Sequence, residues 1–67
     1  MKFRIVETPD SDKENEGRFV GAEEARKLLG YDPDSLSVEE FVGNCFLAVS
    51  VKRNGYTLEI HNDGELV

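Results

Sequence analysis

Cys45 and His61 are the two side chains in this sequence that could act together as a nucleophile and its base. Such chemistry needs the thiol and the imidazole within hydrogen-bonding distance of each other. The β-hairpin predicted below places Cys45 on the core face of one strand and His61 on the opposite face. We therefore expect Cys45 to be a small core residue and His61 a partly exposed strand residue, with no catalytic role for either.

Glu59, His61 and Asp63 alternate along the last predicted strand, so their side chains would share one face. One histidine with two flexible carboxylates is a thin ligand set, and there is no second histidine to complete it. Calcium loops are not predicted either, because Asn15 and Ser37 stand where such a loop needs glycine. No metal site and no cofactor are expected.

Glu39 and Glu40 are adjacent carboxylates that could in principle do acid–base work. Neighbouring residues on a helix point about 100° apart, however, and no apolar pocket is evident that would raise either pKa. A chain of 67 residues also has little room for a ligand pocket. The sequence therefore predicts a protein that is not an enzyme.

Fourteen acidic and eight basic residues give a net charge of −6 and a pI near 4.6. This balance disfavours direct binding to nucleic acid or to an anionic membrane, and it permits binding to a basic protein surface. The alternative is that the acidity only keeps a small protein soluble. The length of 67 residues predicts a single domain over residues 1–67, which we expect to be monomeric. The single cysteine cannot form an internal disulfide, so we expect a reducing, cytoplasmic setting.

The first third of the chain predicts a strand, a loop and a second short strand. Residues 2–7 alternate, with Phe3 and Ile5 on one face. Residues 8–18 contain proline, glycine and many charged residues, which predicts a mobile acidic loop. Residues 18–20 then return beside the first strand.

Residues 21–43 predict an acidic helical segment. A helix is expected over residues 22–29, with its charged residues facing water, and Gly30 is placed to cap its C-terminus. Ser37 and Glu40 form a capping box that opens a second helix, which Gly43 would end. The charged side chains expected to face water on the first helix are Glu23, Glu24, Arg26 and Lys27.

Residues 44–62 predict a β-hairpin that turns at Asn54-Gly55, a strong signal for a type I′ turn. A two-residue loop there pairs Arg53 with Tyr56, Val51 with Leu58 and Val49 with Ile60. The apolar face of the hairpin would then consist of Cys45, Leu47, Val49, Val51, Leu58 and Ile60. A further turn is expected at Asp63-Gly64.

Together these elements predict the α+β class: an antiparallel sheet of three to four strands packed against one to two short helices. Phe3 and Ile5 should join the hairpin in the sheet, and Leu28 and Leu29 should cover it.

The stretch 22-AEEARKLLGYDPDSL-36 is similar to the helix–glycine–helix segment of winged or excisionase-type DNA-binding domains. A recognition helix in such domains needs donor-rich side chains for base edges. The second helix here has acids instead, which phosphates would repel, so we reject DNA reading.

Residues 21–43 carry two bases and six acids, a net charge of −4, whereas the flanking regions are close to neutral. In size, charge and expected architecture the chain resembles phage-encoded inhibitors of bacterial defence complexes, above all the small anti-CRISPR proteins that mimic DNA. The resemblance implies a partner with a basic, nucleic-acid-binding surface, such as a CRISPR interference complex. The partner-binding residues would be Glu23, Glu24, Asp32, Asp34, Glu39 and Glu40.

An alternative from another class stays open. The chain would then be a small accessory or regulatory subunit that binds a protein partner through a sheet edge or through the face containing Phe46 and Val6.

Overall fold

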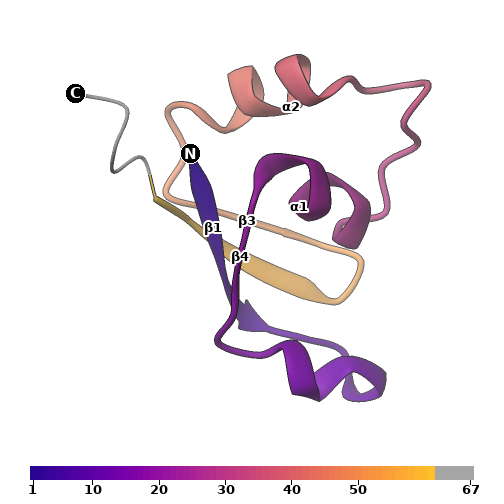
Figure 1. Cartoon of the computed structure of the whole chain (residues 1–67), viewed down its shortest axis with the longest axis vertical. Helices are drawn as coiled ribbons and strands as arrows, with labels where there is room; N and C mark the ends of the chain where they lie inside the picture. The colour runs from indigo at the N-terminus through magenta and orange to yellow at the C-terminus, as the bar shows by residue number, and fades with distance from the viewer. Residues whose placement is uncertain (62–67) are drawn as a thin grey trace.

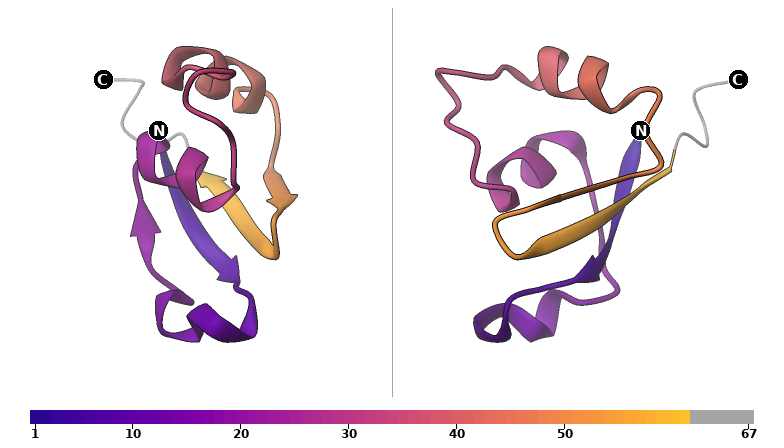
Figure 2. Two further views of the ribbon diagram at one scale, coloured as in Figure 1. Left: turned by 90° about the vertical axis from the view of Figure 1, so that its right-hand side faces the viewer. Right: turned by 180° about the vertical axis from the view of Figure 1, so that it is seen from behind.

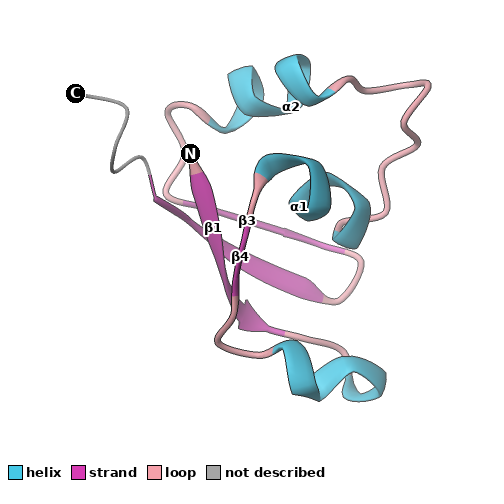
Figure 3. Ribbon diagram, viewed as in Figure 1, coloured by secondary structure: helices cyan, strands magenta, loops and turns pink. Residues whose placement is uncertain are grey.

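A computed structural model describes residues 1–61, which form a four-stranded antiparallel sheet packed with short helices (Figure 1, Figure 3). The predicted α+β class is confirmed. The elements in chain order are β1 (Lys2–Glu7), the 3₁₀ segment η1 (Asp10–Asn15), β2 (Phe19–Val20), α1 (Ala22–Leu28), α2 (Val38–Cys45), β3 (Ser50–Arg53) and β4 (Tyr56–His61). The turn predicted at Asp63-Gly64 lies outside the described residues.

The strand order is β2-β1-β4-β3, and every neighbouring pair is antiparallel. Side chains alternate between the faces of a strand, so β1 buries Phe3 and Ile5 and turns Lys2 and Arg4 to the other face. The predicted pairing of the first strand with the hairpin is confirmed, because β1 lies beside β4.

The hairpin turns at Asn54-Gly55, as predicted. Both residues have left-handed backbones, with φ of 58° and 85°, as a type I′ turn requires. The amide of Ile60 donates to the carbonyl oxygen of Val49 at 2.9 Å. The predicted register is confirmed by the strand partners Arg53–Tyr56 and Val51–Leu58.

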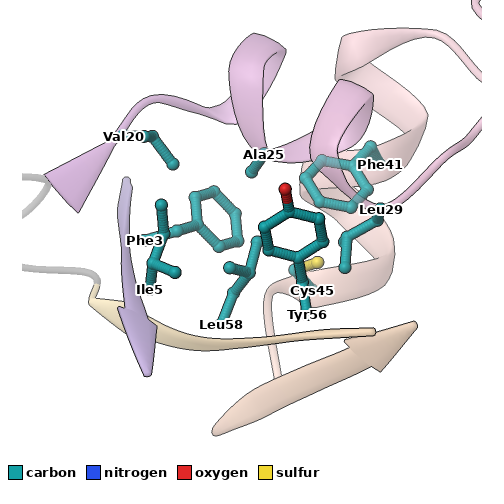
Figure 4. Close-up of a cluster of buried hydrophobic side chains, with 9 residues drawn as sticks. All are labelled: Phe3, Ile5, Val20, Ala25, Leu29, Phe41, Cys45, Tyr56 and Leu58. Atoms are coloured by element: carbon teal, nitrogen blue, oxygen red, sulfur yellow. The ribbon is translucent and has the colours of Figure 1, made fainter. Parts of the chain in front are cut away.

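The core lies between one face of the sheet and the two α-helices, which cover that same face (Figure 2). Phe3 of β1 stacks on Phe41 of α2 with ring centroids 5.5 Å apart, and Leu29 covers the sheet as predicted. Each large apolar side chain buried in this way contributes about 1.5–3 kcal/mol. The buried cluster drawn in Figure 4 consists of Phe3, Ile5, Val20, Ala25, Leu29, Phe41, Cys45, Tyr56 and Leu58.

Helix α1 ends in a Schellman motif at Gly30, the predicted capping residue. Gly30 has φ of 79°, its amide donates to Lys27 O at 3.0 Å, and the Tyr31 amide donates to Arg26 O at 3.3 Å. Glycine adopts this left-handed backbone without the steric cost that a Cβ brings.

Helix α2 begins with the predicted capping box but ends later than predicted. It runs through Gly43 to Cys45, so the expectation that Gly43 stops the helix and that strand begins at residue 44 is wrong. Phe41 and Cys45 are four residues apart, which puts both on one helical face, and both are buried. Burial of that helical face outweighs the weak preference of glycine against helix. Leu47, predicted to face the core, is consequently 92% exposed.

Residues 8–18 contain more structure than the predicted loop. Residues 10–15 form 3₁₀ turns, and the Asp12 amide donates to Pro9 O at 2.9 Å. The hydroxyl of Tyr56 donates to the Asp12 carboxylate, and the Gly17 amide donates to Ile5 O at 2.7 Å. The predicted acidic loop of residues 8–18 therefore contains 3₁₀ turns at residues 10–15, and its predicted mobility stays a prediction.

Candidate interaction surface

The helical layer consists of α1, α2 and the connection between them. The six predicted partner-binding carboxylates all lie in this layer, and all are exposed. Glu23 and Glu24 lie in the first turn of α1, Asp32 and Asp34 in the connection between the helices, and Glu39 and Glu40 in the first turn of α2. The two helices run in opposite senses (Figure 1, Figure 2), so their acidic first turns lie at opposite ends of the layer. The structure therefore spreads the carboxylates over the layer rather than aligning them in one row.

Two of these carboxylates also stabilise local structure. Asp32 Oδ1 accepts the Asp34 amide at 2.9 Å, which fixes the turn that follows Tyr31. Glu40 Oε1 accepts the Ser37 amide at 3.0 Å, and Ser37 Oγ accepts the Glu40 amide at 3.1 Å. Among residues 1–61 no ion pair involves any of the six predicted carboxylates, so their charges are presented to solvent.

Arg26 is the main departure from the predicted charge pattern. It was expected to face water, but it is only 7% exposed, and one guanidinium nitrogen donates to Leu36 O at 2.6 Å. The long side chain packs on the inner side of α1 and reaches the connection to α2. Lys27 is thus the one base of residues 21–43 that is exposed. The layer presents six acids and one base.

The Cys45–His61 pair is separated by the sheet. Cys45 lies in the core at the end of α2, where burial raises the pKa of its thiol. His61 lies on the outer face of β4, where Nε2 is 2.8 Å from Glu59 Oε1 and the ring meets the edge of Phe19 at 5.4 Å between centroids. The expectation that these two residues do not meet is confirmed.

The part of the chain that the structure describes contains no group of three metal-ligand side chains and no pocket. Glu59 and His61 are neighbours on β4, but the third predicted candidate, Asp63, lies outside residues 1–61.

A second exposed surface agrees with the sequence prediction only at Phe46, which is exposed as the alternative binding face requires, and it adds Leu47 and Val49. Phe46, Leu47 and Val49 connect α2 to β3 and are 61%, 92% and 79% exposed. The hairpin prediction had placed Leu47 and Val49 in the core. The overlooked signal was the spacing of Phe41 and Cys45, which continues the helix and shifts the strand start to Ser50.

The fold and its surfaces define a small α+β domain whose helical layer is acidic. Comparisons with protein-family models, with curated sequences and with solved structures give no match. No helix within residues 1–61 has the length and apolar character needed to cross a membrane.

Proposed function

We propose that the protein is a non-enzymatic binding protein whose acidic helical layer occupies a basic, nucleic-acid-binding surface of a partner. The observation that carries this proposal is the set of six exposed carboxylates in residues 23–40, opposed by the single exposed base Lys27. A basic groove that binds the phosphates of nucleic acid also attracts carboxylates, provided that the carboxylates are held on rigid elements.

Burial of Arg26 supports the proposal. Its guanidinium is bound to Leu36 O inside the layer and is not available to a partner. The connection that carries Asp32 and Asp34 is held at both ends, by the Schellman motif and by the capping box at Ser37. Preorganised charges cost less to bind than charges on a free loop, because less conformational entropy is lost.

The partner class follows from the resemblance in size, charge and architecture to anti-CRISPR proteins. The proposed partner is a CRISPR interference complex or another DNA-handling complex, and the proposed mechanism is steric and electrostatic exclusion of nucleic acid. The proposed setting is the cytoplasm of a bacterial host cell.

A gel-shift assay with purified CRISPR interference complexes of several types and a labelled target duplex tests the proposal. Added protein should release the duplex from at least one complex. The affinity for that complex should fall by roughly tenfold or more when salt rises from about 50 to 300 mM, because screening weakens a charge-driven contact. Failure to displace the duplex from any complex would refute the CRISPR-directed form of the proposal. Displacement that is insensitive to salt would refute its electrostatic mechanism.

A further inference from the structure

The outer edge of β3 is the longer of the two open edges of the sheet. β3 spans four residues, whereas β2 at the other edge spans two. No described residue pairs with the outer side of β3, and three of its four residues are exposed. An open edge of this kind is a template for a further strand.

The register of the hairpin identifies which backbone groups the edge presents. Opposed residues in an antiparallel pair alternate between hydrogen-bonded and non-hydrogen-bonded positions. The Ile60 amide donates to Val49 O, so Val49 and Ile60 form a hydrogen-bonded pair. Val51 and Leu58 are paired two positions further along, so they form a hydrogen-bonded pair as well. The intervening residues Ser50 and Lys52 therefore direct their amides and carbonyls away from β4. These four groups are available to a fifth strand.

Exposed apolar side chains lie directly before this edge. Leu47 and Val49 are 92% and 79% exposed, and Phe46 is 61% exposed. A contiguous apolar segment next to unpaired backbone groups is the combination that strand-adding partners use, since the backbone supplies affinity and the side chains supply selectivity.

The charge near the β3 edge indicates which kind of partner segment would bind there. Residues 41–58 contain two bases, Lys52 and Arg53, and no acid, in a chain whose net charge is −6. Lys52 is exposed on the outer face, whereas Arg53 lies over the ring of Tyr31 at 4.3 Å from its centroid and donates to Leu29 O. We propose that the edge of β3 binds an extended segment of a partner protein in which apolar residues alternate with acidic ones.

The alternation of such a segment matches the two faces of β3. Val51 packs against the core on the inner side, while Ser50 and Lys52 stand on the outer side. Apolar side chains of the added strand would extend the inner face, and its acids would lie beside Lys52. A second copy of this chain fits less well, because two β3 edges would bring four bases together. The edge contains none of the six carboxylates of the helical layer, so its role is independent of the proposed function.

A synthetic peptide, acetyl-Thr-Val-Glu-Val-Glu-Val-Thr-amide, tests the proposal by ¹⁵N–¹H NMR titration of the intact protein. We expect saturable shifts centred on the amides of Ser50 and Lys52. The same peptide with lysine in place of glutamate should bind about fivefold more weakly than the acidic peptide. N-methylation of two alternate backbone amides of the acidic peptide should weaken its binding about tenfold. Lys52→Glu should reverse the preference between the two peptides, whereas the matched control Lys13→Glu, a charge change on the exposed η1, should preserve it.

Three results would overturn the proposal. They are the absence of shifts at Ser50 and Lys52 at millimolar peptide, equal binding of the acidic and basic peptides, and concentration-dependent dimerisation through the same amides without peptide. The last result would assign the edge to a second copy of the chain.

Discussion

The side-chain amide of Asn54 donates a hydrogen bond of 3.0 Å to the carbonyl oxygen of Leu28, which joins the hairpin turn to the C-terminal end of α1. Arg53 Nε donates to Leu29 O at 2.9 Å beside it. The last carbonyls of a helix have no partner within the helix, and these two side chains supply partners from 24 and 26 positions away. The turn thereby fixes the helical layer, with its carboxylates, against the sheet.

Replacing Asn54 should separate the two roles of this residue. Asn54→Gly keeps the left-handed backbone and removes the hydrogen bond, so we expect the free energy of unfolding to fall by about 1 kcal/mol. Asn54→Ala adds the cost of a left-handed alanine, for a total of about 2–3 kcal/mol. Urea unfolding measures both losses. Asn44→Ala, at an exposed position of α2, is the control and should change the free energy of unfolding by less than about 0.5 kcal/mol. Equal losses for the glycine and alanine variants would contradict this division of roles.

The acid sensitivity of the fold should depend on Asp12. The hydrogen bond from Tyr56 lowers the pKa of the Asp12 carboxyl, with a smaller contribution from the Asn15 side chain. A pKa lowered in the folded state contributes stability above the unfolded value, and that stability is lost as pH falls through the folded pKa. Melting temperatures measured from pH 7 to pH 2.5 should show this loss.

Tyr56→Phe removes the donor, so it should lower the melting temperature near neutral pH and flatten its dependence on pH in the acid range. Tyr31→Phe is the control, because the Tyr31 hydroxyl makes no hydrogen bond within residues 1–61. An unchanged acid profile in the Tyr56 variant would exclude Asp12 as the responsible group.

Packing of the aliphatic part of the Arg26 side chain should contribute more to the stability of the helical layer than the charge of its guanidinium does. Its Nε is buried without a partner, and a buried charge gains little over an apolar side chain of similar size. We expect Arg26→Ala to cost about 2–4 kcal/mol and Arg26→Met about 1 kcal/mol or less, measured by urea unfolding. Lys27→Ala, at the neighbouring exposed position, should be nearly neutral. A methionine variant as unstable as the alanine variant would show that the guanidinium itself is required.

The capping box should be worth about 1 kcal/mol to α2. Ser37→Ala removes the acceptor for the Glu40 amide, and loss of an N-cap side chain typically costs that amount. Ser35→Ala, in the connection between the helices, is the matched control, since the Ser35 side chain makes no hydrogen bond in the part of the chain that the structure describes. Chemical denaturation of both variants measures the difference. Equal stabilities would mean that the box contributes nothing.

The sequence predicted those parts of the fold that local chemistry determines. The Asn54-Gly55 turn, the Gly30 cap and the capping box at Ser37 each need only a few neighbouring residues, and all three are present. The end of α2 was mispredicted because Cys45 satisfies both a helical and a strand pattern. Burial of Phe41 and Cys45 together in the core cluster that α2 shares with the sheet decides in favour of the helix.

The candidate site was predictable in its residues but not in its arrangement. Exposure of the six carboxylates follows from their types and positions. Burial of Arg26 and the opposite senses of α1 and α2 depend on contacts between distant segments, which no local pattern encodes. The η1 segment likewise depends on the Tyr56–Asp12 hydrogen bond, across 44 positions.

The central claim is tested most directly by charge reversal in the duplex-displacement assay. Glu24→Lys with Glu39→Lys changes two exposed carboxylates of the helical layer whose side chains bind no other side chain within residues 1–61, and it leaves the Glu40 capping box intact. Glu14→Lys with Glu16→Lys makes the same charge change in and beside η1, which lies at the opposite end of β1 from α2 (Figure 1). Both variants should first give the circular dichroism spectrum of the parent, which checks that they fold. We predict that the first double variant loses displacement of DNA from the partner complex by tenfold or more, while the second stays within about threefold of the parent. Equal displacement by both variants would contradict the claim that the helical layer is the binding surface.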